Sequence, residues 1–293
     1  MILYPIKKVG EEMIRNLKPR NMRLISGNEY FKLIRVSEEQ KSNLKPLIFI
    51  NGQMDHHLQA IETATNITKP CCYQYSGYYQ YDDSIHTPYI FLYDYPIYEI
   101  DKSKIDLNAF SFKLIKIFEE LNLSDIDLMG QSCGGMIATL ASKSDRVDKV
   151  IAMHAPIYGS PLINKEQYNS LLKYMNLREK TLFRLISLIV DESFGFMQDN
   201  SKGFRNIEEI SDLSKIIFTT SDISNGDSKN ILANFIAQTI YKYFGLKNDG
   251  VITYDKEKME SDGIKYVEEE AISHFEMANK DYNNQYYKKY LIR

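Results

Sequence analysis

The stretch "LMGQSCGGMIATLAS" (residues 128–142) decides how this sequence is interpreted. An apolar run ends at Gly130, Ser132 lies between glycines, and a helical pattern of small residues begins directly afterwards. A sharp strand–turn–helix connection can hold a serine hydroxyl clear of the backbone, and glycines two residues before and after the serine relieve the crowding of the turn. Gly130 and Gly134 occupy these two positions. The pattern therefore favours an activated nucleophile over an ordinary strand-to-helix turn.

Two neighbouring side chains, those of Ser132 and Cys133, could act as the nucleophile. If Cys133 did so, Gln131 would stand two residues before it, where a side chain would clash. Ser132 is therefore the predicted nucleophile, and it needs a neighbouring base to remove its proton. Cys133 is expected to contribute its backbone N–H to an oxyanion hole.

The composition is globular and has no strong charge bias. The 293 residues are 44% hydrophobic, and 36 basic against 39 acidic residues give a net charge of −3. This balance offers no basic surface for nucleic acid, so nucleic-acid binding is not expected. No signal peptide is apparent, and no apolar run approaches the roughly 18–20 residues that a spanning helix needs. We therefore expect a cytoplasmic protein, unless it is exported by another signal.

Short apolar runs alternate with helical patterns through most of the chain. Residues 21–36 predict a β-hairpin. Further strands are expected at 46–50, 89–96, 125–129, 149–156, 215–222 and 264–271, and helices at 57–66, 107–121 and 230–244. This alternation predicts a single α/β domain with a mostly parallel central sheet and helices on both faces.

Residues 163–213 interrupt the alternation. Apolar residues at helical spacing predict two short helices there, near 171–175 and 182–189. The interval is too long for a simple crossover between neighbouring strands, so we interpret it as a helical cap or lid over one edge of the sheet. Additional packing without a gating role is the alternative.

Three further segments, taken with "GQSCGG", resemble landmarks of a known family. They are "APIYGSPL" (155–162), "NDGVI" (248–252) and "SHFEM" (273–277). In this order they resemble the α/β-hydrolase fold, and in detail its bacterial triacylglycerol lipase branch. In those lipases a Thr-Pro leads to Gly-Ser-Pro, an acid-bearing loop follows, and a histidine segment comes last. The resemblance spans roughly residues 46–277 and implies a Ser–Asp–His triad that acts on esters.

The base and the acid follow from the chain order that this fold uses, in which the histidine comes last. Of the five histidines, only His274 lies after the candidate acids. Asp249, in "NDGVI", is the favoured acid because its loop resembles that of the lipases and lies closer in sequence to His274. Asp222, directly after a predicted strand, is the alternative acid. The acid would fix the imidazole tautomer and stabilise the imidazolium that forms as Ser132 attacks.

A second oxyanion donor is expected just after the strand at 46–50. Members of the family usually have His-Gly and then the donor residue there, whereas this chain has Asn51, Gly52 and Gln53. Because the hole needs a backbone N–H rather than a particular side chain, Gln53 is the candidate donor.

No metal or other cofactor is expected. Asp55, His56 and His57 suggest a metal site, but adjacent histidines point in different directions and no third ligand follows at a suitable spacing, so a helix start is favoured. Some lipases of this branch bind a structural calcium through an aspartate two residues after the histidine. Glu276 takes that position here, so the sequence does not support calcium binding.

These features predict a serine hydrolase that cleaves carboxylic esters of hydrophobic acyl groups, from small molecules or lipids, through an acyl-enzyme on Ser132. The tyrosine-rich residues 71–96 either line the mouth of the site or pack as a long loop on the sheet edge. An acyltransferase or a thioesterase would use the same triad. A catalytically silent member of the fold that binds a ligand or partner protein is the alternative from another class.

Overall fold

The computed structural model describes residues 23–27, 31–35, 43–50, 52, 72–73, 79–80, 85–93, 107–159, 165–177, 179–181, 209, 211–274, 276 and 286–292. The helix expected at 57–66 and the helical pattern at 182–189 lie outside these residues. The cap expected at 163–213 therefore stays a prediction.

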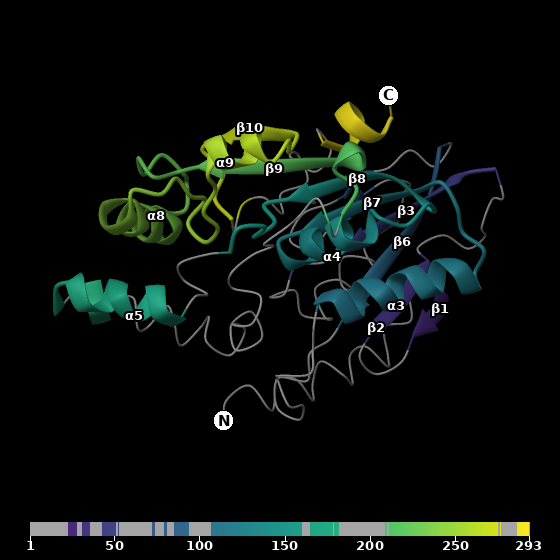
Figure 1. The fold of residues 1–293 in the computed structure, drawn as a ribbon, viewed down its shortest axis with the longest axis horizontal. Helices are drawn as coiled ribbons and strands as arrows, with labels where there is room; N and C mark the ends of the chain where they lie inside the picture. The colour runs from purple at the N-terminus through teal and green to yellow at the C-terminus, as the bar shows by residue number, and fades with distance from the viewer. Residues whose placement is uncertain are drawn as a thin grey trace.

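Eight strands form one sheet in the spatial order β1-β2-β6-β3-β7-β8-β9-β10 (Figure 1). From β6 to β10 all neighbouring strands pair in parallel, and β2 and β1 extend the sheet antiparallel from the β6 edge. The strands are β1 (Arg23–Gly27), β2 (Phe31–Arg35), β3 (Lys45–Ile50), β6 (His86–Tyr93), β7 (Ile126–Gln131), β8 (Val147–Met153), β9 (Ile216–Asp222) and β10 (Tyr266–Glu270). The predicted hairpin and the predicted parallel sheet are thus confirmed.

The central strands are apolar because both faces of the sheet are covered. Every residue of β7 is buried, and so are residues 46–50 of β3. A parallel sheet with layers on both faces requires such runs of buried, mostly apolar residues rather than an alternating pattern. Tyr89, from the tyrosine-rich segment, is 1% exposed in β6 and belongs to this core. Elsewhere in that segment, β4 (Cys72–Tyr73) and β5 (Tyr79–Gln80) form a separate antiparallel pair.

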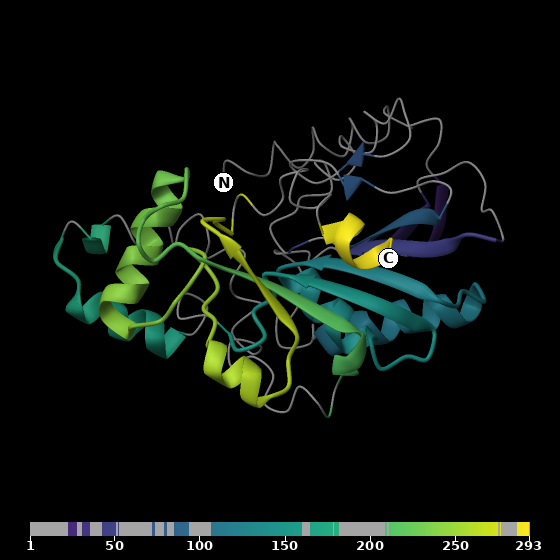
Figure 2. The same cartoon turned by 90° about the horizontal axis from the view of Figure 1, so that it is seen from above.

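Helices α3 (Leu107–Glu120) and α4 (Cys133–Ala141) lie against one face of the sheet, and the π-helical turn η3 (Tyr287–Leu291) lies on the opposite face (Figures 1 and 2). The amphipathic pattern predicted for α3 is confirmed, because Leu107, Phe110, Leu114 and Phe118 are all buried in the core. Helix α4 is buried at all of its positions, which explains its small and apolar composition.

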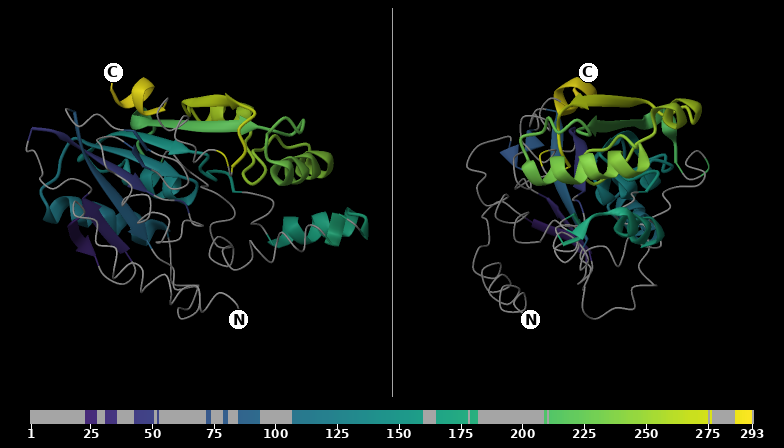
Figure 3. Two further views of the ribbon diagram at one scale, coloured as in Figure 1. Left: turned by 180° about the vertical axis from the view of Figure 1, so that it is seen from behind. Right: turned by 90° about the vertical axis from the view of Figure 1, so that its left-hand side faces the viewer.

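The remaining described helices are α5 (Lys165–Tyr174), α8 (Ile231–Phe244) and α9 (Lys256–Ser261). Helices α5 and α8 lie side by side at one end of the molecule (Figure 3). Met175, just after α5, packs against Ile236 and Ile240 of α8. The predicted helix at 230–244 corresponds to α8, which is capped at its start by the Asn230 side chain.

Candidate active site

Ser132 occupies the sharp turn between β7 and α4. Its backbone has φ 52° and ψ −121°, a combination outside the regions that ordinary residues populate. The turn is tight because helix and strand approach closely: a Cβ atom on Gly130 would lie 2.3 Å from the carbonyl oxygen of Gly134. A Cβ on Gly135 would lie 2.8 Å from the Cβ of Ala155. The glycines singled out in the sequence therefore permit this turn, which holds the serine in one orientation.

Three side chains from separate parts of the chain form a hydrogen-bonded series at the carboxyl ends of the strands. The Ser132 hydroxyl donates to Nε2 of His274 at 3.1 Å. Nδ1 of His274 donates to Oδ2 of Asp249 at 2.8 Å. Both contacts have the length expected of a nucleophile, its base and the group that orients the base.

The loop that carries Asp249 is fixed by buried polar contacts between β9 and α8. The Asn248 side chain donates to the backbone carbonyls of Ala237 and Leu246. The backbone carbonyl of Asn248 accepts the N–H of Ile223. Asn248 is completely buried, so these hydrogen bonds are shielded from water. These contacts fix the position of the loop that carries Asp249.

The Asp249 carboxylate accepts four hydrogen bonds. Oδ1 accepts the backbone N–H groups of Val251 and Ile252, at 2.9 and 2.7 Å. Oδ2 accepts Nδ1 of His274 and, at 2.7 Å, Nδ1 of His154. Burial by itself would raise the pKa of Asp249, but the electrostatic interaction with His274 and the hydrogen bonds from both histidines hold that pKa well below its usual range. The carboxylate is therefore an anion at neutral pH, although it is only 2% exposed.

His274 lies on a turn after β10 that is tied down on two sides. Its backbone N–H donates to the backbone carbonyl of Asp249 at 2.8 Å. Two residues later, Oε2 of Glu276 accepts the Ser273 hydroxyl and N–H and the Ser228 hydroxyl. Glu276, noted in the sequence only as a departure from a calcium-binding aspartate, thus links the histidine turn to the segment before α8.

The alternative acid, Asp222, makes different contacts. Its Oδ1 accepts the N–H and the hydroxyl of Ser224, and its Oδ2 lies 3.6 Å from Nζ of Lys247. It caps the turn that follows β9. Of the two candidate acids, Asp249 is the one that contacts His274.

Of the two predicted oxyanion donors, Cys133 belongs to the described residues and Gln53 does not. Cys133 is the first residue of α4 and is fully buried. The N–H groups in the first turn of a helix point away from the helix's own hydrogen bonds, at the positive end of its dipole. Gln53 lies outside the described residues, as do Asp55, His56 and His57, so the predictions for them stay untested.

His154, Asp249 and His274 are the one group of possible metal ligands found in the described part of the chain. Their contacts favour hydrogen bonding over metal binding. Each imidazole Nδ1 lies only 2.7 or 2.8 Å from the same carboxylate oxygen, which is the distance of a direct hydrogen bond. A cation would require both nitrogens to lose their protons and both hydrogen bonds to be given up.

Sequence reasoning did not identify the contact between His154 and Asp249. His154 directly follows β8 and precedes the segment 155–162 that resembles lipases, but only its exclusion as the base was inferred. The two residues are 95 positions apart, and the pairing of β8 with β9 helps to bring them together. The signal in the sequence was a histidine directly after a buried strand, next to the edge where the nucleophile was expected.

No family model matches the sequence, and no curated protein is detectably similar to it. Solved structures do match along almost the whole chain. A bacterial membrane phospholipase A, described as a virulence factor, is 13% identical, with a TM-score of 0.52 over 99% of this chain and 93% of that one. Lip1 of Acinetobacter baumannii is also 13% identical, with a TM-score of 0.50 over 98% and 95%. Naproxen esterase (carboxylesterase NP) of Bacillus subtilis is 11% identical, with a TM-score of 0.48 over 97% and 96%.

The strand order and the whole-length structural matches show that this chain has the α/β-hydrolase fold. The phospholipase A and Lip1 share this fold with the chain at low sequence identity. In the described residues, no helix is long and apolar enough to cross a membrane.

Proposed function

We propose that this protein is a serine hydrolase that cleaves carboxylic esters through an acyl-enzyme. The observation that carries the proposal is the unbroken hydrogen-bonded series from Ser132 through His274 to Asp249. One hydrogen bond joins the serine hydroxyl to a basic imidazole nitrogen, and the other joins that imidazole to a carboxylate. This arrangement activates a hydroxyl for acyl transfer. The order Ser…Asp…His along the chain is also the one typical of this fold.

In the acylation step, the Ser132 oxygen attacks the ester carbonyl carbon while His274 Nε2 takes the hydroxyl proton. The imidazolium that forms stays next to the anionic Asp249, which stabilises it without itself becoming protonated. His274 then passes the proton to the leaving alcohol as the bond between the carbonyl carbon and the alcohol oxygen breaks. An acyl group remains on Ser132.

The negative charge that develops on the carbonyl oxygen needs backbone N–H donors. We assign this role to Cys133, at the start of α4, and to Gln53. In the second half of the reaction, water gives a proton to His274 and attacks the acyl carbon. The carboxylic acid is released as Ser132 regains its proton.

We propose that the acyl group is hydrophobic, in a small-molecule or lipid ester. This proposal rests on the apolar patterns of the predicted cap, which includes α5, and on the fold shared with a phospholipase A and Lip1. The same triad would serve an acyltransferase or a thioesterase, which differ in the acceptor or in the leaving group.

Two measurements test the proposal. The folded protein is treated with a fluorophosphonate, which reacts with activated serines, and the adduct is mapped by mass spectrometry. It is then assayed with chromogenic esters of increasing acyl length, with thioesters, and with added alcohols as acceptors. We expect an adduct on Ser132 and hydrolysis that favours longer acyl chains.

The matched variants are Ser132→Ala, expected to lose labelling and hydrolysis, and Ser261→Ala, an exposed serine of α9 expected to retain both. Folded protein without an adduct on Ser132 would favour the catalytically silent alternative. Transfer to alcohols that outpaces hydrolysis would favour the acyltransferase.

A further inference from the structure

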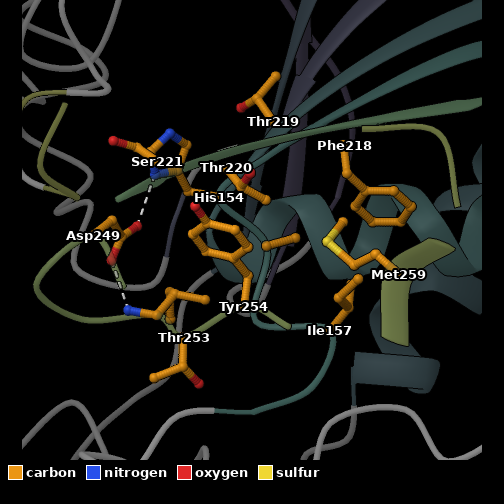
Figure 4. A pocket seen from close by; sticks show the side chains of 12 residues that line it. His154, Ile157, Phe218, Thr219, Thr220, Ser221, Asp249, Thr253, Tyr254 and Met259 are labelled. Atoms are coloured by element: carbon orange, nitrogen blue, oxygen red, sulfur yellow. Dashed lines mark hydrogen bonds and ion pairs between the residues drawn. The ribbon is translucent and has the colours of Figure 1, made fainter. Parts of the chain in front are cut away.

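His154 is a buried histidine that the proposed acyl-transfer steps do not use. Its side chain is 1% exposed, and its Nδ1 donates to Oδ2 of Asp249 at 2.7 Å (Figure 4). That oxygen already accepts Nδ1 of His274, so two imidazoles share one carboxylate oxygen. The two rings meet edge to face, with their centroids 6.2 Å apart.

The position of His154 is determined by its backbone. It follows β8 directly, and its N–H donates to the carbonyl of Thr219 in β9. Its φ of 46° lies in the left-handed region, which histidine and asparagine tolerate better than most residues. The chain thus turns at the end of β8 in a way that directs this ring at the acid.

The hydrogen bond to Asp249 decides where the proton of His154 lies. An ionised carboxylate can only accept hydrogen bonds, so Nδ1 of His154 must carry a proton. Nε2 is buried and has no hydrogen-bond partner among the described residues. His154 also lines a cavity of about 10 Å³ together with Thr219, Thr220 and Tyr254, which is close to the smallest space that can hold a water molecule.

We propose that His154 is a positioning residue for the acid of the triad: it holds the Asp249 carboxylate at the angle from which Oδ2 meets His274. Two backbone N–H groups fix Oδ1, and His154 supplies a donor to Oδ2 in addition to His274. Without His154 the carboxylate can rotate about its Cβ–Cγ bond, and the imidazole it orients rotates with it. The inference rests on the proposed function, since a positioning role has meaning only if Ser132 and His274 perform the chemistry.

The first test measures the tautomer of the His154 imidazole directly in the unaltered protein. Histidine labelled with ¹⁵N is incorporated, and long-range ¹H–¹⁵N spectra at neutral pH identify the protonated nitrogen of each ring. We expect two strongly deshielded Nδ1–H protons, one from His154 and one from His274, assigned by the loss of a signal in each single variant. A His154 ring protonated at Nε2 alone would overturn the inference, whatever the enzyme activity.

The second test separates orientation from folding. His154→Asn keeps an N–H donor near the position of Nδ1 and tolerates the left-handed backbone, whereas His154→Leu has a similar size and no donor. We expect His154→Asn to retain kcat within about threefold and His154→Leu to lower kcat about tenfold or more, with KM nearly unchanged in both. Tyr254→Phe is the matched control: it alters the same cavity, but its hydroxyl bonds to Glu268 rather than to Asp249.

The two proposals fail in different ways. Unlabelled Ser132 in the folded, unaltered protein contradicts the hydrolase. A labelled and active protein in which His154→Leu keeps the full kcat contradicts the positioning role alone. If His154→Leu does not fold, two measurements still test the inference: the tautomer of His154, and the kcat of His154→Asn compared with that of the unaltered enzyme. A kcat for His154→Asn that is reduced as far as that of an Asp249 variant would overturn the inference.

Discussion

His274 is hydrogen-bonded to Asp249 twice, once through the backbone and once through the side chains. Its backbone N–H donates to the carbonyl of Asp249 at 2.8 Å, and its Nδ1 donates to the Asp249 carboxylate, also at 2.8 Å. The backbone contact fixes where the imidazole stands, and the side-chain contact fixes how it is turned. The two functions can be separated by substitution, because only the second one depends on the carboxylate.

Asp249→Asn should leave the turn in place and remove the acceptor. The amide presents an N–H where Oδ2 now accepts two imidazole protons, so His274 loses its preferred tautomer. We expect kcat to fall about 10⁴-fold, the loss typical of a triad whose histidine is held in the wrong tautomer. Steady-state hydrolysis of a chromogenic ester measures the loss. Asp222→Asn is the control and should keep nearly full activity, because Asp222 contacts Ser224 and Lys247. Equal losses in the two variants would argue against Asp249 as the acid.

Gly130→Ala tests whether the elbow depends on close approach. The added Cβ would lie 2.3 Å from the carbonyl oxygen of Gly134, a backbone atom that cannot move without displacing α4. We expect the free energy of unfolding to fall by about 3 kcal/mol or more. Gly245→Ala provides the comparison, since Gly245 has φ 67° but nothing within 4 Å of the added atom, so it should cost only about 1 kcal/mol. Urea unfolding measures both, and similar losses would mean that close packing at Gly130 is unimportant.

The order of the elements could be predicted from the sequence because it depends on local patterns. The apolar strands at 46–50 and 125–129 and the amphipathic helix at 107–121 each follow from the spacing of a few residues, and the structure confirms them. The turn at Ser132 could be recognised because close approach demands glycine at fixed positions. Motif order along the chain then directed attention to Asp249 and His274.

Contacts between distant segments could not be predicted in this way. The hydrogen bond from His154 to Asp249 depends on how the turn after β8 faces the loop after α8, and no periodicity encodes that geometry. The link from Glu276 to Ser228 also joins two irregular segments, 48 positions apart. For such pairs, the sequence shows only that polar residues stand near the ends of strands.

Glu276→Gln should weaken the support of the histidine turn, most clearly at neutral pH. Burial would raise the pKa of Glu276, but the hydrogen bonds from Ser228 and Ser273 lower it overall. A carboxyl group whose pKa is depressed by folding stabilises the protein above its unfolded pKa, and this contribution is lost as the pH falls through the folded pKa. At pH 7 we expect the variant to lose about 1–2 kcal/mol of unfolding free energy, because hydrogen bonds to a charged acceptor are replaced by weaker ones.

Urea unfolding at several pH values distinguishes this role from a general loss of stability. The difference between Glu276→Gln and the unaltered protein should shrink as the pH is lowered below about 4, since Glu276 is then protonated in the unfolded chain and increasingly in the folded one. Glu260→Gln, in an exposed contact with Tyr266, should change stability little at any pH. A difference that is independent of pH would contradict a role for the Glu276 charge.

Asp127→Ala should destabilise the protein without altering the chemistry of the site. Asp127 is fully buried near the start of β7, where its carboxylate accepts Nζ of Lys45 at 3.1 Å and Nε2 of His86 at 2.9 Å. His86 in turn contacts the Tyr287 hydroxyl at 2.8 Å, so this cluster links η3 to the sheet. Removing one partner from a buried ion pair typically costs about 3–5 kcal/mol.

Because the strands are parallel, the cluster lies at the edge of the sheet opposite Ser132. Folded Asp127→Ala should therefore react with a fluorophosphonate at the unaltered rate while unfolding at lower urea, and slower labelling of the folded fraction would show that the two edges are coupled.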